Sequence, residues 1–201
     1  MNHGFFHPQA DEYGASGYCN LDLACFNGTA LIPLSMVVSI PWGLTCLKRR
    51  ASTSVALLLT AEGTHFCTGT LLNNGRQDGR LLLLTAGHCV PARPDLMLFG
   101  FGYEHGACEE ELAGMEPGMR TLQGGRVLAT GKATDFALLE LREQPHPSWG
   151  LHLAGWDRRP HAPVNVVCLH HPRGDVKKVS YLEGACRPAQ WSEPPAHRWH
   201  W

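Results

Sequence analysis

Charged residues are scarce in this chain, and neither sign of charge prevails. They make up 17% of the 201 residues, with Lys+Arg 17 against Asp+Glu 18 and a net charge of -1. This balance provides no overall positive field that would attract nucleic acid or anionic lipid. Hydrophobic residues make up 44%, which excludes a disordered chain and indicates a substantial core. We therefore expect a folded protein that binds neither nucleic acid nor a membrane.

Long uninterrupted helices are not expected either, because the chain contains 22 Gly and 14 Pro. Short apolar runs between turn residues instead predict a series of strands. The run 80–86 is almost continuously apolar, which is typical of a strand buried on both faces, and the glycine-rich stretch 103–125 predicts a loop. No internal repeat is evident, so the pattern favours an all-β sandwich or barrel. The predicted strands are 55–60, 65–72, 80–86, 97–102, 126–130, 136–141, 164–170 and 177–183.

The chain has no C-x-x-C motif, and its first residues lack the basic and apolar regions of a signal peptide. Its eight cysteines (19, 25, 46, 67, 89, 108, 168 and 186) are an even, widely spaced set, which favours disulfides and an oxidising compartment. We therefore expect a secreted or periplasmic protein, although these residues carry no export signal. A zinc module that uses His65, Cys67, His88 and Cys89 is a less favoured alternative, because C-x-x-C is absent.

Residues 27–47 are uncharged and precede the basic residues 48–50, a pattern that also fits a membrane span. Two prolines, Pro33 and Pro41, interrupt this stretch. Proline in mid-span removes helical hydrogen bonds, so extended strand segments are the favoured interpretation.

One segment of the chain, LTAGHC, ends a predicted buried strand and then turns at Gly87. The turn presents His88 at the rim of the predicted sheet, with Cys89 beside it. A bond from Cys89 to Cys67 on the preceding strand would fix this turn, at a gain of about 3 kcal/mol on the chain-entropy model. It would also hold the imidazole in position, as a general base requires.

A second segment, DFALL, places Asp135 at the start of an apolar strand. A carboxylate in that position needs a partner, and the Nδ1–H of His88 would supply one. The pairing would fix both the tautomer and the orientation of the histidine ring.

The blocks CTGTLLNN, LLTAGHCV, TDFALLEL, AGWDRR and HHPRGD resemble, in the same order, blocks of the bacterial lysyl endopeptidases, which are trypsin-like serine proteases. The start GYCNLDLAC is similar to the start of their mature enzyme. The resemblance implies an all-β, trypsin-like double β-barrel in which His88 is the general base and Asp135 its orienting acid. It further implies disulfides Cys67–Cys89 and Cys25–Cys108, cleavage of a peptide or protein substrate after lysine, and neither cofactor nor metal.

The sequence departs from this family at the nucleophile. The serines that follow Asp135 are Ser148, Ser180 and Ser192, and none has the flanking glycines that would let backbone N–H groups form an oxyanion hole. We therefore expect a fragment that stops before the nucleophile and is inactive alone. The alternative is a non-catalytic module that still holds peptides.

The predicted organisation follows from the same resemblance. Residues 1–16 are expected to form a tail, 17–148 a first β-barrel with the His/Asp pair, and 149–201 the opening strands of an incomplete second barrel. Cys19, Cys46, Cys168 and Cys186 receive no partner, and no oligomeric state is predicted. His170 and His171 are interpreted as structural or rim residues, and Arg173, Lys177 and Lys178 as a solvated basic face.

Overall fold

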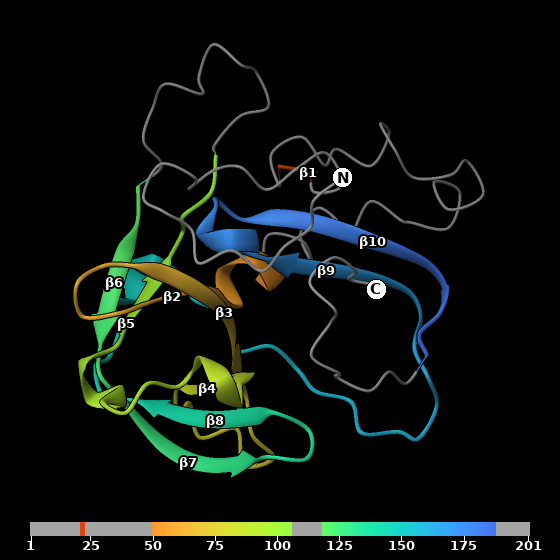
Figure 1. The fold of residues 1–201 in the computed structure, drawn as a ribbon, viewed down its shortest axis with the longest axis horizontal. Helices are drawn as coiled ribbons and strands as arrows, with labels where there is room; N and C mark the ends of the chain where they lie inside the picture. The colour runs from red at the N-terminus through yellow and green to blue at the C-terminus, as the bar shows by residue number, and fades with distance from the viewer. Residues whose placement is uncertain (1–20, 23–49, 106–117, 188–201) are drawn as a thin grey trace, which may run out of the picture.

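The computed structural model describes residues 21–22, 50–105 and 118–187. In this part of the chain the structure is almost entirely β, with short 3-10 turns between strands (Figure 1). A larger sheet contains β2 (Val55–Leu59), β3 (His65–Leu72), β4 (Leu82–Ala86), β5 (Leu98–Phe101), β6 (Arg120–Gln123), β7 (Gly125–Gly131) and β8 (Phe136–Leu141). A smaller sheet contains β1 (Leu21–Asp22), β9 (Val164–His170) and β10 (Lys178–Ala185). The turns are η3 (Gly87–Cys89), η4 (Pro94–Leu96), η6 (Pro147–Trp149) and η7 (Pro172–Gly174), and residues 50–54 are helical.

The larger sheet closes into a barrel through Gly124. The strand order is β6-β5-β2-β3-β4-β8-β7, so β6 and β7 lie at opposite ends of that order while a single residue joins them in the chain. Gly124 donates to the carbonyl of Met97 at 2.8 Å and accepts from Arg142 at 3.0 Å, and its φ of +84° suits glycine. The bent strand 120–131 therefore pairs with β5 along its first half and with β8 along its second half.

The barrel interior is filled by alternate residues of its strands, as the period of two requires. Ala137, Leu139 and Leu141 of β8 are buried, as are Phe99 and Phe101 of β5. β2 is buried along its whole length, because the smaller sheet lies beside its outer face (Figure 1). The all-β prediction is therefore confirmed.

Several predicted details are corrected. The loop expected over 103–125 contains β6, a four-residue strand whose Leu122 is its buried member. The run 80–86 is not buried on both faces, since Leu84 is 40% exposed. β1 falls inside the range predicted for the first barrel, yet it pairs with β10 of the smaller sheet.

The chain stays on the barrel beyond the expected linker. Ala154 donates to the carbonyl of Leu71 in β3 and accepts from the N–H of Asn73, the residue that follows β3, each at 2.9 Å. Trp149, together with Leu151 and Leu153, packs against the barrel core. The crossing to the smaller sheet therefore begins after Ala154 rather than at residue 148.

The smaller sheet is attached to the barrel by residues 171–178, which we name the docking segment. Lys177 is 1% exposed, and its Nζ donates to the carbonyl of Ser52 at 2.8 Å and to the carboxylate of Glu104 at 3.0 Å. Its backbone N–H donates to the carbonyl of Tyr103 at 2.8 Å. Lys178 is also buried and lies 3.4 Å from the carboxylate of Asp175. The prediction of a solvated basic face is therefore wrong for both lysines.

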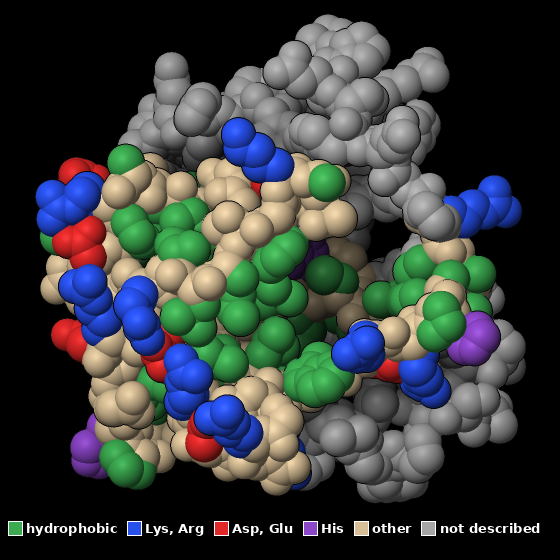
Figure 2. All heavy atoms as spheres, turned by 90° about the horizontal axis from the view of Figure 1, so that it is seen from below, with side chains coloured by type: hydrophobic (Ala, Val, Ile, Leu, Met, Phe, Trp, Pro, Cys, Tyr) green, Lys and Arg blue, Asp and Glu red, His purple; other side chains and the backbone are tan. Residues whose placement is uncertain are grey.

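The face formed by β4, β7 and β8 carries most of the exposed large hydrophobic side chains of the barrel. Leu84, Val127, Leu128 and Phe136 are each between a third and a half exposed. Figure 2 views the molecule from this side and shows hydrophobic side chains gathered near the middle of the face, with charged side chains along one flank. No helix in the described ranges is both long and apolar enough to cross a membrane. The stretch 27–47, for which the sequence favours extended strand segments, lies outside the described residues.

Candidate active site

Two strand ends carry the residues singled out from the sequence. β4 ends at Ala86 and η3 follows at once, which places His88 just beyond the rim of the barrel. β8 begins at Phe136, directly after Asp135. Because Ala86 and Phe136 are partners in the ladder between β4 and β8, His88 and Asp135 are neighbours in space.

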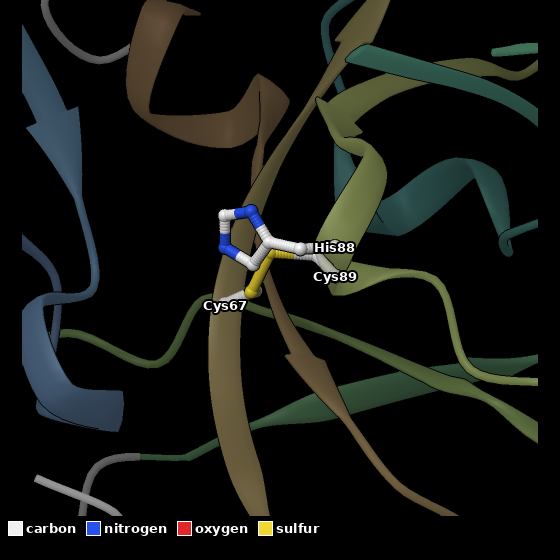
Figure 3. Close-up of side chains that lie close together, drawn as sticks. All are labelled: Cys67, His88 and Cys89. Atoms are coloured by element: carbon white, nitrogen blue, oxygen red, sulfur yellow. A yellow bond between two sulfur atoms is a disulfide. The ribbon is translucent and has the colours of Figure 1, made fainter. Parts of the chain in front are cut away.

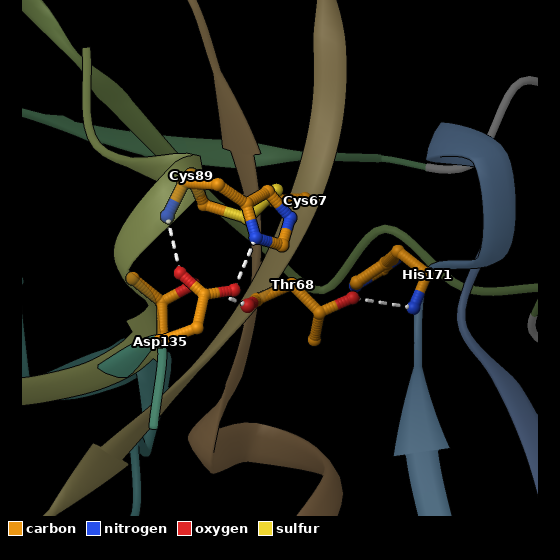
Figure 4. Close-up of a disulfide and its surroundings, with 7 residues drawn as sticks. Cys67, Thr68, Cys89, Asp135 and His171 are labelled. Carbon is orange, nitrogen blue, oxygen red and sulfur yellow. Dashed lines mark hydrogen bonds and ion pairs between the residues drawn. A yellow bond between two sulfur atoms is a disulfide. The ribbon is translucent and has the colours of Figure 1, made fainter. Parts of the chain in front are cut away.

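The carboxylate of Asp135 contacts His88 in two places (Figure 4). Oδ2 accepts from the ring Nδ1–H at 2.5 Å, and Oδ1 accepts from the backbone N–H of the same histidine at 2.9 Å. A third bond joins the Gly87 N–H to the backbone carbonyl of Asp135 at 2.8 Å. The bidentate contact fixes the ring on its Nδ1–H tautomer, so Nε2 is the atom that can take up a proton.

The hydrogen bond from the His88 ring lowers the pKa of Asp135 below its ordinary value of 3.8. The nearby backbone N–H groups of His88 and Gly87 lower it further. The carboxylate is therefore ionised at neutral pH. Asp135 has φ +48°, in the left-handed region, which aspartate tolerates better than most residues. Both side chains are open to solvent, at 56% exposure for the histidine and 47% for the aspartate.

Cys67 of β3 and Cys89 of η3 form a disulfide with a Cα–Cα distance of 6.1 Å, within the usual range (Figure 3). The bond lies close to the His88 ring, with both sulfur atoms within 4.8 Å of a ring nitrogen. It also bears on the zinc hypothesis. The sulfur atoms of both cysteines lie near the His88 ring nitrogens, but they are bonded to each other and offer no thiolate. His65, the fourth proposed ligand, donates from Nδ1 to the carbonyl of Gly174 at 2.9 Å.

The remaining predicted site residues lie elsewhere or outside the description. Cys25, Cys108 and Ser192 are outside the described residues. The hydroxyl of Ser148 is 2.7 Å from Nδ1 of His146, and that of Ser180 is 2.7 Å from Nε2 of His170. Among the described cysteines, Cys168 and Cys186 are free.

His171 is a buried histidine of the docking segment, as its structural interpretation requires. Its Nδ1–H donates to the carbonyl of Asp175 at 2.9 Å, and Nε2 is buried without a hydrogen-bond partner. Burial lowers its pKa to about 3, so the ring is neutral across the physiological range.

Two threonines of the site were not identified from the sequence. Thr85 donates its hydroxyl to the carbonyl of Thr68 at 2.8 Å. The hydroxyl of Thr68 accepts from the His171 N–H at 2.9 Å (Figure 4). Thr85 stands three residues before His88, and that proximity is a usable signal. Nothing in the sequence distinguishes Thr68, because its partner in the docking segment is a backbone group more than a hundred residues away.

Comparison with known proteins identifies the family of this chain. A family model described as "Lysyl endopeptidase, C-terminal domain" matches residues 13–201. The lysyl endopeptidase of Pseudomonas aeruginosa is 30% identical to this chain over 178 residues, which are 85% of the chain and 35% of that relative. The chain is thus related to proteases, and its strands and turns are those expected of a trypsin-like fold. It belongs to the lysyl endopeptidase family, and it spans little more than a third of the length of the relative.

Proposed function

We propose that this chain supplies the general base and the orienting acid of a serine endopeptidase. The observation that carries the proposal is the two-point contact of the Asp135 carboxylate with His88 at the barrel rim. An ionised Asp135 holds the Nδ1 proton, which leaves Nε2 to accept a proton from a nucleophile and return it to the leaving amine. The name of the Pseudomonas relative supports lysine as the residue after which cleavage occurs.

The nucleophile of this reaction is proposed to lie outside the described serines. Ser148 and Ser180 hydrogen bond to histidines other than His88, and neither is flanked by glycines. The His88–Asp135 pair is about half exposed, so water has free access to it. We therefore propose that this chain alone does not hydrolyse peptide bonds, that it represents a part of the catalytic unit, and that its second barrel is incomplete.

The location proposed for the protein is an oxidising compartment, secreted or periplasmic. The Cys67–Cys89 disulfide supports this location, because such bonds persist where thiols are not kept reduced. The Cys25–Cys108 bond stays a prediction. The division near residue 148 also stays a proposal, with its boundary moved to the residues that follow Ala154.

The proposal can be tested with two substrates of the same lysine, an activated ester and an amide. A positioned imidazole can assist attack of water on the ester, so the chain should hydrolyse it weakly, and the amide not measurably. His88→Ala should abolish the ester reaction and Asp135→Asn should lower it, whereas His161→Ala, which changes an exposed histidine, should leave it unchanged.

Three outcomes would count against the proposed function. Ester hydrolysis that survives His88→Ala would refute the role of general base. Amide hydrolysis, with a phosphonylating probe found on Ser148, Ser180 or Ser192, would show that the nucleophile is misplaced. Binding of lysyl peptides that is indifferent to His88→Ala, without any hydrolysis, would favour the non-catalytic peptide-binding module.

A further inference from the structure

Close to His88, β3 and β4 are joined by side-chain bonds instead of a backbone ladder. The backbone ladder between these strands consists of the pairs Thr70–Leu84, Leu71–Leu83 and Leu72–Leu82, and it extends no further toward the site. Beyond it, side chains make the connection. They are the hydroxyl of Thr85, which donates to the Thr68 carbonyl, and the disulfide between Cys67 and Cys89. The residues that carry His88 are thus held to β3 at Cys67 and Thr68.

The docking segment is attached to the same place on β3. The His171 N–H, which belongs to a residue only 4% exposed, donates to Oγ1 of Thr68 at 2.9 Å. Further along, the carbonyl of Gly174 accepts from His65, and Lys177 is bonded to Ser52, Tyr103 and Glu104. The segment is therefore fixed to the barrel at several points, of which Thr68 lies beside the site (Figure 4).

Thr68 is the residue at which these two connections meet. Its side chain holds the docking segment, and its carbonyl holds Thr85, whose ladder partner Ala137 lies two residues from Asp135. Thr68 therefore links the docking segment to the end of β4 that precedes His88.

We propose that Thr68 is a positioning residue that couples the docking segment to the His88–Asp135 pair. The inference rests on the proposed role of that pair, but it concerns how the pair is held rather than what it does. It assigns the docking segment a part in the geometry of the base, although the segment contributes no atom to the two hydrogen bonds between His88 and Asp135.

The variant Thr68→Val tests the coupling because it keeps the β-branched shape and removes the acceptor. A methyl group needs about 3.5 Å or more from its neighbours, so the 2.9 Å contact cannot persist and the buried His171 N–H loses its partner. Thr68→Ser retains the hydroxyl and should restore the wild-type behaviour. Thr70→Val is the matched control, on the same strand and face, since no described residue hydrogen bonds to the Thr70 hydroxyl.

The readout is the tautomer of the His88 ring, measured at alkaline pH from nitrogen chemical shifts in long-range proton–nitrogen correlation spectra of the labelled full chain. The wild-type ring should be on its Nδ1–H tautomer. Thr68→Val should lower the ratio of Nδ1–H to Nε2–H tautomers about tenfold, and it should speed exchange of the His171 amide by a similar factor. A merely structural role would lower the denaturation temperature and leave the tautomer of the folded protein unchanged.

Faster exchange at His171 with an unchanged His88 tautomer, in folded Thr68→Val, would overturn the coupling. A wild-type ring on the Nε2–H tautomer would instead contradict the His88–Asp135 pair, and thereby the proposed function. Should Thr68→Val fail to fold, native-state amide exchange of the wild type provides the same test. The His171 amide and the amides of 86–89 should then open together as denaturant rises, and openings at clearly different denaturant concentrations would refute the proposal.

Discussion

The buried lysine of the docking segment offers a direct measure of what attaches the smaller sheet to the barrel. Replacing Lys177 by methionine keeps the length and apolar character of the side chain and removes the ammonium group. The change leaves the Ser52 carbonyl, the Ser52 hydroxyl and the Glu104 carboxylate without their shared donor, at 2.8, 3.2 and 3.0 Å in the native protein.

The expected cost can be derived from the burial of each group. Removing one partner of a fully buried ion pair costs about 3–5 kcal/mol, since the remaining charge is stranded. Glu104 is 33% exposed and keeps its bond from Ser52, so its carboxylate can regain part of its hydration. We therefore expect Lys177→Met to lower the free energy of unfolding by about 2–3 kcal/mol. The double variant Lys177→Met/Glu104→Gln should lose less than the sum of its two single changes, by about 1–2 kcal/mol.

The pH dependence gives an independent check. Burial lowers the pKa of Lys177 below its ordinary value of 10.5, and the nearby Glu104 opposes part of this shift. Between the folded and the unfolded pKa the unfolded chain binds more protons, so the contribution of Lys177 to stability should rise with pH across that alkaline interval. This rise should be missing in Lys177→Met.

Equilibrium unfolding in urea measures all of these quantities, with Lys132→Met, which alters an exposed lysine, as the control. A loss at Lys177 no larger than that of the control would refute the reasoning. So would strict additivity in the double variant, because it would mean that Lys177 and Glu104 do not interact.

Three further perturbations have defined outcomes. The pKa of His171 is lowered to about 3, so between about pH 6.5 and 3 the unfolded chain binds a proton that the native ring does not. The urea concentration at the unfolding midpoint should therefore fall as the pH is lowered through this range. It should fall less steeply in His171→Asn. The Cys67–Cys89 bond spans 22 residues, so the paired Cys→Ala variant should lose about 3 kcal/mol on the chain-entropy model, and an unchanged thermal midpoint would contradict this. A Cβ at Gly69 would lie 2.5 Å from Cδ2 of Leu83, so Gly69→Ala should cost about 1–3 kcal/mol in urea unfolding, while Gly75→Ala, which meets no atom within 4 Å, should cost far less.

The sequence predicts well those strands whose apolar residues alternate or run together. β3, β8 and β9 begin and end at the predicted residues, and the other predicted strands differ by one or two residues at their ends. β6 was missed because it has four residues and a single buried one, Leu122, which is too little for a periodic signal. The burial of Leu84 is predicted wrongly because an apolar run does not reveal which residues of a barrel strand face outward and are left exposed to solvent.

The contacts around the site can likewise be divided into those that the sequence predicts and those that it does not. His88 and Asp135 could be predicted as a pair because each lies just outside the end of a strand, and the ladder of β4 with β8 brings those ends together. The burial of Lys177 could not be predicted, since it depends on Glu104 and Ser52, which are distant in sequence. A charge next to another charge is usually solvated, and only the docking of one sheet on the other reverses that expectation.

The pairing of β1 with β10 has a consequence for the order in which the protein folds. This pairing joins Leu21 to Val179, which are 158 residues apart, so in an unfolded chain a loop of that length would have to close before the smaller sheet is complete. The barrel strands, in contrast, are mostly neighbours along the chain. Once the barrel has formed, it brings the distant segments close together and shortens the effective loop, which lowers the entropy still to be lost. β1 should therefore join β10 last, with the finished barrel as its template.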